Sequence, residues 1–83
     1  MKKELTIYPN PLQGSHLSIE STIYFNNMVD VKITDMEGRE VYSQPNYATG
    51  NKIELNPIDL TRGLFVVSIQ YKQLRQSGVL IVY

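Results

Sequence analysis

The chain has 83 residues, no cysteine, and eight basic and eight acidic side chains that give a formal net charge of zero. This length suits one small domain, and without cysteine neither disulfide bonds nor a cysteine-based zinc site can stabilise it. Balanced charge, with the basic residues scattered, argues against a surface for nucleic acid or anionic lipid, and no apolar stretch approaches the roughly 20 residues of a membrane-spanning helix.

The first predicted element is a short strand from Leu5 to Tyr8 that stops at the sequence Pro9-Asn10-Pro11. Proline fixes φ at about −65° and has no N–H to donate to a neighbouring strand. The residue before each proline is driven toward extended geometry. We therefore expect Tyr8 and Asn10 to be extended, in a stiff corner that leads out of the strand.

Two strands are predicted next, and the second of them has the clearest pattern in the chain. The first runs from His16 to Glu20, where Leu17 and Ile19 alternate with polar neighbours. The other has a strict period of two, which is typical of a strand with one buried face. Its apolar positions are Val29, Val31 and Ile33, and its polar positions are Asp30, Lys32 and Thr34. The segment between the two strands, which contains Tyr24 and Phe25, shows no clear pattern.

A hairpin is predicted at Asp35-Met36-Glu37-Gly38. Aspartate favours the start of a turn, and the glycine can take the positive φ that a short loop requires. The return strand is Arg39 to Gln44, in which Val41 is expected to face the core. A loop from Pro45 to Gly50 follows this strand.

Three further strands are predicted in the second half of the chain. They contain Ile53 with Leu55, Leu64 to Tyr71, and Val79 to Tyr83. Asn56-Pro57 ends the first of them, and a polar turn from Lys72 to Ser77 separates the last two. The strand that begins at Leu64 starts with apolar residues on both faces, so Leu64 and Val66 predict cover on both sides of the sheet at that point.

About seven short strands predict an all-β fold, an Ig-like antiparallel β-sandwich with Greek-key connections. The segment from Leu60 to Phe65 supports a sandwich because it has the spacing of a tyrosine corner: a leucine for the core, a glycine for the turn and an aromatic residue two positions later. Phe65 can supply the packing of such a corner but has no hydroxyl for its hydrogen bond. We expect positive φ at Gly38 and Gly63. The predicted core contains Val31, Ile33, Val41, Leu60, Phe65, Val67 and Ile69.

The residue pattern predicts no catalytic, cofactor or metal site. The one histidine, His16, lies at a junction of turn and strand, where a surface role is expected because a catalytic histidine needs placed partners. Asp35 and Glu37 flank one turn, but calcium needs about six or more oxygen ligands, so we interpret Asp35 as a turn residue. The five glycines are isolated, which does not fit a phosphate-binding loop.

Four tyrosines leave two interpretations open. They are Tyr24, Tyr42, Tyr47 and Tyr71. Tyrosine supplies rigid amphipathic contact area, as in a platform that binds carbohydrate or protein. Tyrosine also favours strands and fills the rim of a small core, and we prefer this structural interpretation.

Several segments of the chain occur in an order that is similar to a known family. They are Tyr8-Pro9-Asn10-Pro11, Val31 to Val41, Leu60 to Ile69, and a closing apolar strand. The second segment has an acid, a glycine, a basic residue and a valine in order, namely Asp35, Gly38, Arg39 and Val41. Together these segments resemble the C-terminal sorting domain of the type IX secretion system of Bacteroidetes. The resemblance covers essentially the whole chain and implies that residues 1–83 are a single sorting domain, excised from a larger exported protein.

The resemblance also implies a non-catalytic signal that takes a cargo protein through the periplasm and the outer membrane to the cell surface or the medium. The implied partners are the outer-membrane translocon, a sortase-like peptidase that removes the domain from many cargoes, and the cargo that is covalently joined to it. The candidate recognition residues are Tyr8, Pro9, Asn10, Pro11, Asp35, Gly38, Arg39, Gly63, Phe65, Val79, Leu80, Ile81, Val82 and Tyr83.

The closing strand from Val79 to Tyr83 leaves two roles open. It is apolar, uncharged and β-prone, so a receptor could pair with its edge, or the sandwich could simply bury it. The alternative function for the whole domain is an Ig- or fibronectin-like module that binds carbohydrate or protein beside an enzyme.

Overall fold

The computed structural model describes residues 5–12, 14–20, 28–48, 52–55 and 58–83. Most of these residues lie in seven strands: β1 (Thr6–Tyr8), β2 (Leu17–Glu20), β3 (Met28–Asp35), β4 (Glu40–Ala48), β5 (Lys52–Leu55), β6 (Gly63–Tyr71) and β7 (Leu74–Val82). No helix long and apolar enough to cross a membrane occurs within these ranges.

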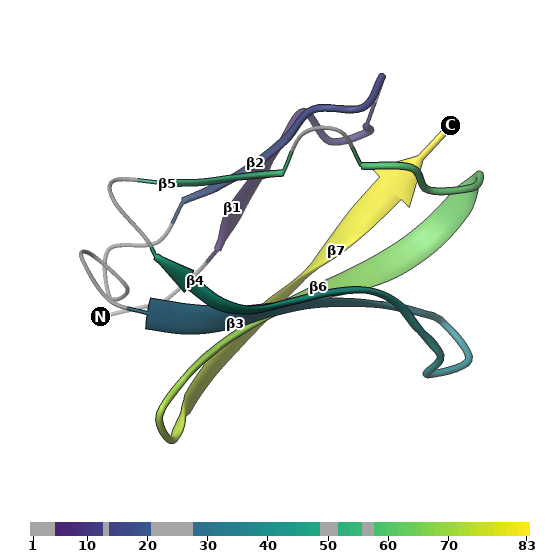
Figure 1. Ribbon diagram of the computed structural model, residues 1–83. Coiled ribbons are helices and arrows are strands. Elements are labelled where there is room, and N and C mark those ends of the chain that lie inside the picture. Colours follow the sequence, from purple (N-terminus) through teal and green to yellow (C-terminus); the bar gives the residue numbers. More distant parts are fainter. Residues whose placement is uncertain (1–4, 13, 21–27, 49–51, 56–57) are drawn as a thin grey trace.

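The strands form two antiparallel sheets that pack as a sandwich (Figure 1). The smaller sheet has the order β1-β2-β5, and the larger has the order β4-β3-β6-β7. The connections after β2, β4 and β5 cross from one sheet to the other, which makes neighbours of strands that are not consecutive in the chain. The prediction of an all-β sandwich of seven strands is confirmed, and the strand order is consistent with an Ig-like arrangement.

One apolar cluster fills the space between the sheets. Leu17 and Ile19 of β2 meet the larger sheet from one side, and β3 buries its three predicted apolar positions from the other. The remaining members are Leu12, Ile53, Leu55, Ile58, Phe65, Val67, Ile69, Leu80 and Val82. Leu60, which was expected in the core, is half-buried at its margin. Each fully buried aliphatic side chain contributes about 1.5–3 kcal/mol, so this cluster is the main source of stability.

The prediction that Val41 faces the core is wrong, since its side chain is 44% exposed. Tyr42 pairs with the inward-facing Ile33, so its neighbour Val41 faces outward. A bulge lies at this point as well, because Thr34 pairs with Glu40 and leaves Val41 without a partner on β3. Tyr42 takes the inward position and packs against the core. The buried face of β4 therefore follows from its pairing with β3 and not from the apolar character of Val41.

Two strand boundaries also differ from the sequence prediction by several residues. β4 continues to Ala48, through part of the predicted loop. β7 begins at Leu74 because the turn before it contains just two residues, Lys72 and Gln73, and Tyr71 already pairs with Leu74. The polar residues expected to form a longer turn therefore lie in a strand.

The larger sheet is covered on one side at the start of β6. Leu64 is 47% exposed and Val66 is half-buried, so the expected cover on both sides is wrong. Both residues stand on the outer face, while Phe65 between them points into the core. Other sequence predictions, at Tyr24, Phe25, Gly50 and Asn56-Pro57, lie outside the described residues.

Candidate recognition site

The sequence motifs meet at one end of the larger sheet. Strand pairing places Asp35 of β3 opposite Phe65 of β6, and Phe65 opposite Leu80 of β7. The corner glycine, Gly63, lies opposite Val82. Figure 1 shows the β3–β4 hairpin, the start of β6 and the C-terminal end of β7 at this end of the molecule. The topology thus brings together motif segments that are far apart in the sequence.

Asp35 organises the β3–β4 hairpin. Its Oδ1 accepts hydrogen bonds from the N–H groups of Glu37 and Arg39, both at 2.9 Å, and its Oδ2 accepts one from Arg39 Nε at 2.8 Å. The bond from the Arg39 N–H is the main reason that the pKa of Asp35 lies below its ordinary value. Gly38 has a φ of 88° and donates to the Asp35 carbonyl at 3.1 Å. Asp35 is therefore a turn residue, as interpreted from the sequence.

The corner before β6 agrees with its sequence prediction at Gly63 and Phe65. Gly63 has a φ of 147°, so positive φ is confirmed for both predicted glycines. Phe65 is 4% exposed and lies in the core cluster. An open concavity of about 550 Å³ separates this corner from the hairpin, and exposed Met36, Val41 and Leu64 are among its lining residues. The predicted motif residues of the hairpin and the corner therefore share one surface.

The opening motif reaches the last strand through Asn10 and Leu12. Both prolines of the motif follow cis peptide bonds. The Asn10 side chain donates from Nδ2 to the Val79 carbonyl at 3.0 Å and accepts the Ile81 N–H at Oδ1, also at 3.0 Å. The Leu12 N–H donates to the Ile81 carbonyl at 2.6 Å, and Leu12 forms a parallel bridge with Val82.

Sequence reasoning selected Asn10 but missed Leu12. Leu12 is buried in the core cluster, although it follows a segment rich in turn residues. The one available signal was an isolated leucine directly after a proline-rich corner. An apolar side chain gains no stability from exposure in a surface turn, so such a leucine indicates burial. Nothing in the sequence links Asn10 to Val79, which is 69 positions away.

The terminal strand divides its side chains between the core and the outer face. Leu80 and Val82 are buried, whereas Val79, Ile81 and Tyr83 are exposed. Pairing sets Ile81 beside Leu64 and Val79 beside Val66. These four residues, Leu64, Val66, Val79 and Ile81, form an apolar row on the outer face of the larger sheet, which we call the outer row.

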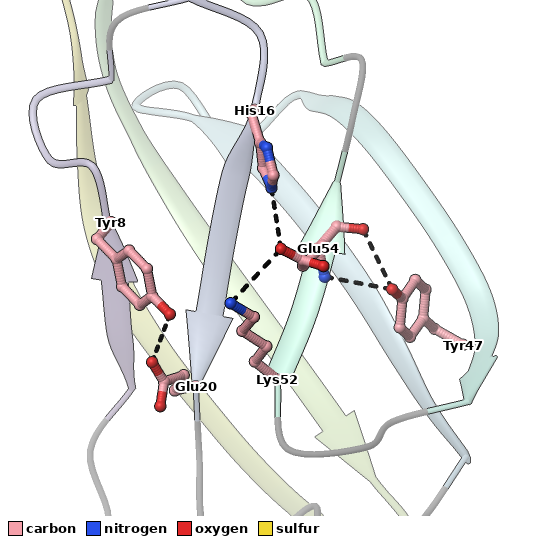
Figure 2. Close-up of polar contacts among 6 residues, drawn as sticks. All are labelled: Tyr8, His16, Glu20, Tyr47, Lys52 and Glu54. Atoms are coloured by element: carbon pink, nitrogen blue, oxygen red, sulfur yellow. Dashed lines mark hydrogen bonds and ion pairs between the residues drawn. The ribbon is translucent and has the colours of Figure 1, made fainter.

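A polar arrangement covers the outer face of the smaller sheet (Figure 2). His16 Nε2 lies 3.1 Å from Glu54 Oε1, and Lys52 Nζ lies 3.6 Å from the same oxygen. The Tyr8 hydroxyl donates to the Glu20 carboxylate, and this hydrogen bond raises the pKa of Tyr8. Ion pairs this exposed contribute about 0–1 kcal/mol. His16 has the surface role expected of it, and the described ranges contain no group of three or more histidine or acidic residues that could hold a metal ion.

Tyr47 connects the two sheets at the edge of β5. Its hydroxyl donates to the Glu54 carbonyl at 3.1 Å and accepts the Glu54 N–H at 3.2 Å (Figure 2). Tyr47, Tyr42 and Tyr71 are all partly buried and packed against the core. For these three tyrosines the interpretation as core rim is confirmed, and Tyr24 lies outside the described residues.

A family model described as the secretion system C-terminal sorting domain matches residues 6–83. The matched range contains the opening motif, the hairpin, the corner and the terminal strand. No curated protein matches the chain.

Proposed function

The chain belongs to the family of secretion system C-terminal sorting domains, which serve type IX secretion, and we propose that it directs a larger cargo protein through the outer-membrane translocon. The match over residues 6–83 is the observation that carries this proposal. In this role the domain is a non-catalytic signal, and residues 1–83 are one unit of a longer exported protein.

We propose that the translocon reads the end of the sandwich where the motifs meet. The outer row offers an uncharged contact surface there, because all four of its side chains are apolar. Val79 is 52% exposed, and the other three residues of the row lie on the same face of the sheet. Exposed apolar side chains gathered on one face are typical of protein interaction sites. The cargo passes through the periplasm and reaches the cell surface or the medium, where a sortase-like peptidase can remove the domain.

The alternative, an Ig- or fibronectin-like binding module, depended on an exposed tyrosine platform. Three of the four tyrosines on which it rested pack against the core instead. No other observation on the described residues favours that alternative over a sorting signal.

The test is export of a reporter. Residues 1–83 are fused to the C-terminus of a reporter that carries its own signal for the periplasm, in a bacterium with a type IX system. We expect the reporter at the surface or in the medium, and in the periplasm of a strain without the translocon. A folded fusion that stays in the periplasm of the first strain contradicts the proposal.

Variants of the terminal strand refine this experiment. Deleting residues 80–83 would remove two buried side chains, Leu80 and Val82, and would unfold the domain. Val79→Thr and Ile81→Thr change outward side chains and retain β propensity, so they should stay folded. We expect these two variants to reduce export while circular dichroism and thermal melts remain close to those of the wild type.

A further inference from the structure

The Asn10 side chain takes the place of a neighbouring strand at the outer edge of β7. A carboxamide carries one acceptor and one donor group, as a peptide unit does. Asn10 presents its donor to the Val79 carbonyl and its acceptor to the Ile81 N–H, both at 3.0 Å. The backbone N–H of Leu12 continues the same row of hydrogen bonds at the Ile81 carbonyl.

The register of the β6–β7 hairpin explains why these groups are available. A two-residue turn makes Tyr71 and Leu74 a hydrogen-bonded pair, and paired residues then alternate between bonded and non-bonded along the hairpin. By this alternation Val79 and Ile81 turn their N–H and C=O groups away from β6. β7 is the last strand of its sheet, so these groups face the open edge.

Because Asn10 and Leu12 occupy this edge, they limit the ways in which a partner protein can bind the terminal strand. A strand added beside Val79 and Ile81 would need three backbone groups that Asn10 and Leu12 already occupy. The side chains of Val79 and Ile81 stay exposed on the outer face. The part of β7 that is open to a partner is therefore its face and not its edge.

We propose that Asn10 is a positioning residue for sorting: its carboxamide holds the end of β7 in the sheet, so that Val79 and Ile81 present the outer row to the translocon. This inference rests on the proposed function. It makes the opening motif and the terminal strand one recognition unit, although nearly the whole domain separates them in the sequence.

The first test measures the strand itself by amide hydrogen exchange of the 83-residue chain. Asn10→Ala removes the acceptor of the Ile81 N–H, so the exchange rate of this amide should rise at least about tenfold relative to the slowest core amides. Asn10→Asp keeps an acceptor for Ile81 but sets an oxygen against the Val79 carbonyl, so its effect should have the same direction. An unchanged Ile81 exchange rate in Asn10→Ala overturns the inference.

The second test measures export and uses Tyr47→Phe as the matched control. This control also removes two hydrogen bonds between a side chain and the edge of a strand, but it does so at β5. We expect Asn10→Ala to lower export several-fold and Tyr47→Phe to leave it near the wild-type value, at a temperature where circular dichroism shows both fusions folded. Equal loss in both variants means that export follows stability alone and overturns the inference, as does wild-type export by Asn10→Ala.

The two tests separate the inference from the function on which it rests. If the wild-type fusion itself is not exported, the proposed function fails and the sorting role of Asn10 fails with it. The exchange experiment still decides whether Asn10 holds the strand, because its result does not depend on a translocon.

Discussion

At two places a side chain from one side of the sandwich forms hydrogen bonds with the edge strand of the opposite sheet. We call these places the β7 seam and the β5 seam. At one seam Asn10, from the segment after β1 of the smaller sheet, bonds to the edge of β7 in the larger sheet. At the other seam Tyr47, from β4 of the larger sheet, bonds to the edge of β5 in the smaller sheet. Exposed strand edges invite pairing with other chains, so both closures reduce the edge that another chain could pair with.

The two seams differ in how far apart in the sequence their bonded residues lie. Tyr47 and its partner Glu54 are seven positions apart, so one connection between neighbouring strands is enough to bring them together. Asn10 and Ile81 are 71 positions apart, and a buried leucine and a parallel bridge support their contact. The β5 seam is therefore a local feature, whereas the β7 seam exists only when the whole sandwich has formed.

The largest expected effect comes from the core that both seams depend on. Phe65→Ala should lower the free energy of unfolding by about 3–5 kcal/mol, because it empties a buried site between the strands that carry the motifs. Urea unfolding followed by circular dichroism measures the loss, and Phe65→Leu, which fills most of the site, should lose less. A loss below about 1 kcal/mol would mean that the corner does not support the core.

The second-largest effect should distinguish the β7 seam from the β5 seam. Leu12→Ala should lower the free energy of unfolding by about 2–5 kcal/mol, and Leu55→Ala, which removes the same side chain from β5, should lose a similar amount. Only Leu12→Ala should also speed exchange of the Ile81 amide relative to the core and promote self-association, measured by analytical ultracentrifugation. If Leu55→Ala opens β7 equally, the contrast between the seams is wrong.

A smaller effect is expected away from both seams. Gly38→Val should cost about 1–2 kcal/mol, since a β-branched residue is strained at the positive φ of this turn. Gly38→Asn should lose less, because asparagine tolerates this conformation. Thermal unfolding measures both variants, and the exchange of the Ile81 amide should keep its wild-type ratio to that of the core amides.

The smallest effect belongs to the local seam. Tyr47→Phe should cost about 0.5–1.5 kcal/mol, because water can replace its hydroxyl at the exposed Glu54 backbone. Val41→Thr, on the same strand but at the exposed bulge, should stay within about 0.5 kcal/mol of the wild type. Chemical unfolding distinguishes the two, and a larger loss for Val41→Thr would indicate that Val41 faces the core after all.

Local patterns predicted most of the fold. Alternation identified β3 and its buried face, and the sequence of the hairpin identified Asp35 and Gly38, because each of these signals depends on residues close together in the chain. The bulge at Val41 was not predictable from alternation, since it depends on how β4 pairs with β3. The exposed outer face at Leu64 was missed because a run of apolar residues looks the same whether one or both faces are covered.

The candidate recognition site was predictable as a set of segments but not as a surface. The motif order selected Asn10, Phe65 and the terminal strand, and none of these signals showed that they touch. The Asn10 carboxamide and the edge of β7 are joined by tertiary structure alone. Long-range polar contacts of this kind leave no periodicity in the sequence, so they appear only when the strands are placed in space.

The hydrogen bonds between Asn10 and β7 also set an order of events during synthesis. Val79 is made 69 residues after Asn10, so at about 5–20 residues per second the carboxamide waits roughly 3–14 seconds for its partner. Until then the nascent sandwich has an unfilled place at the edge of its larger sheet. A chain cut short before Ile81 cannot fill that place, and under the proposed role of Asn10 it would never display a complete signal.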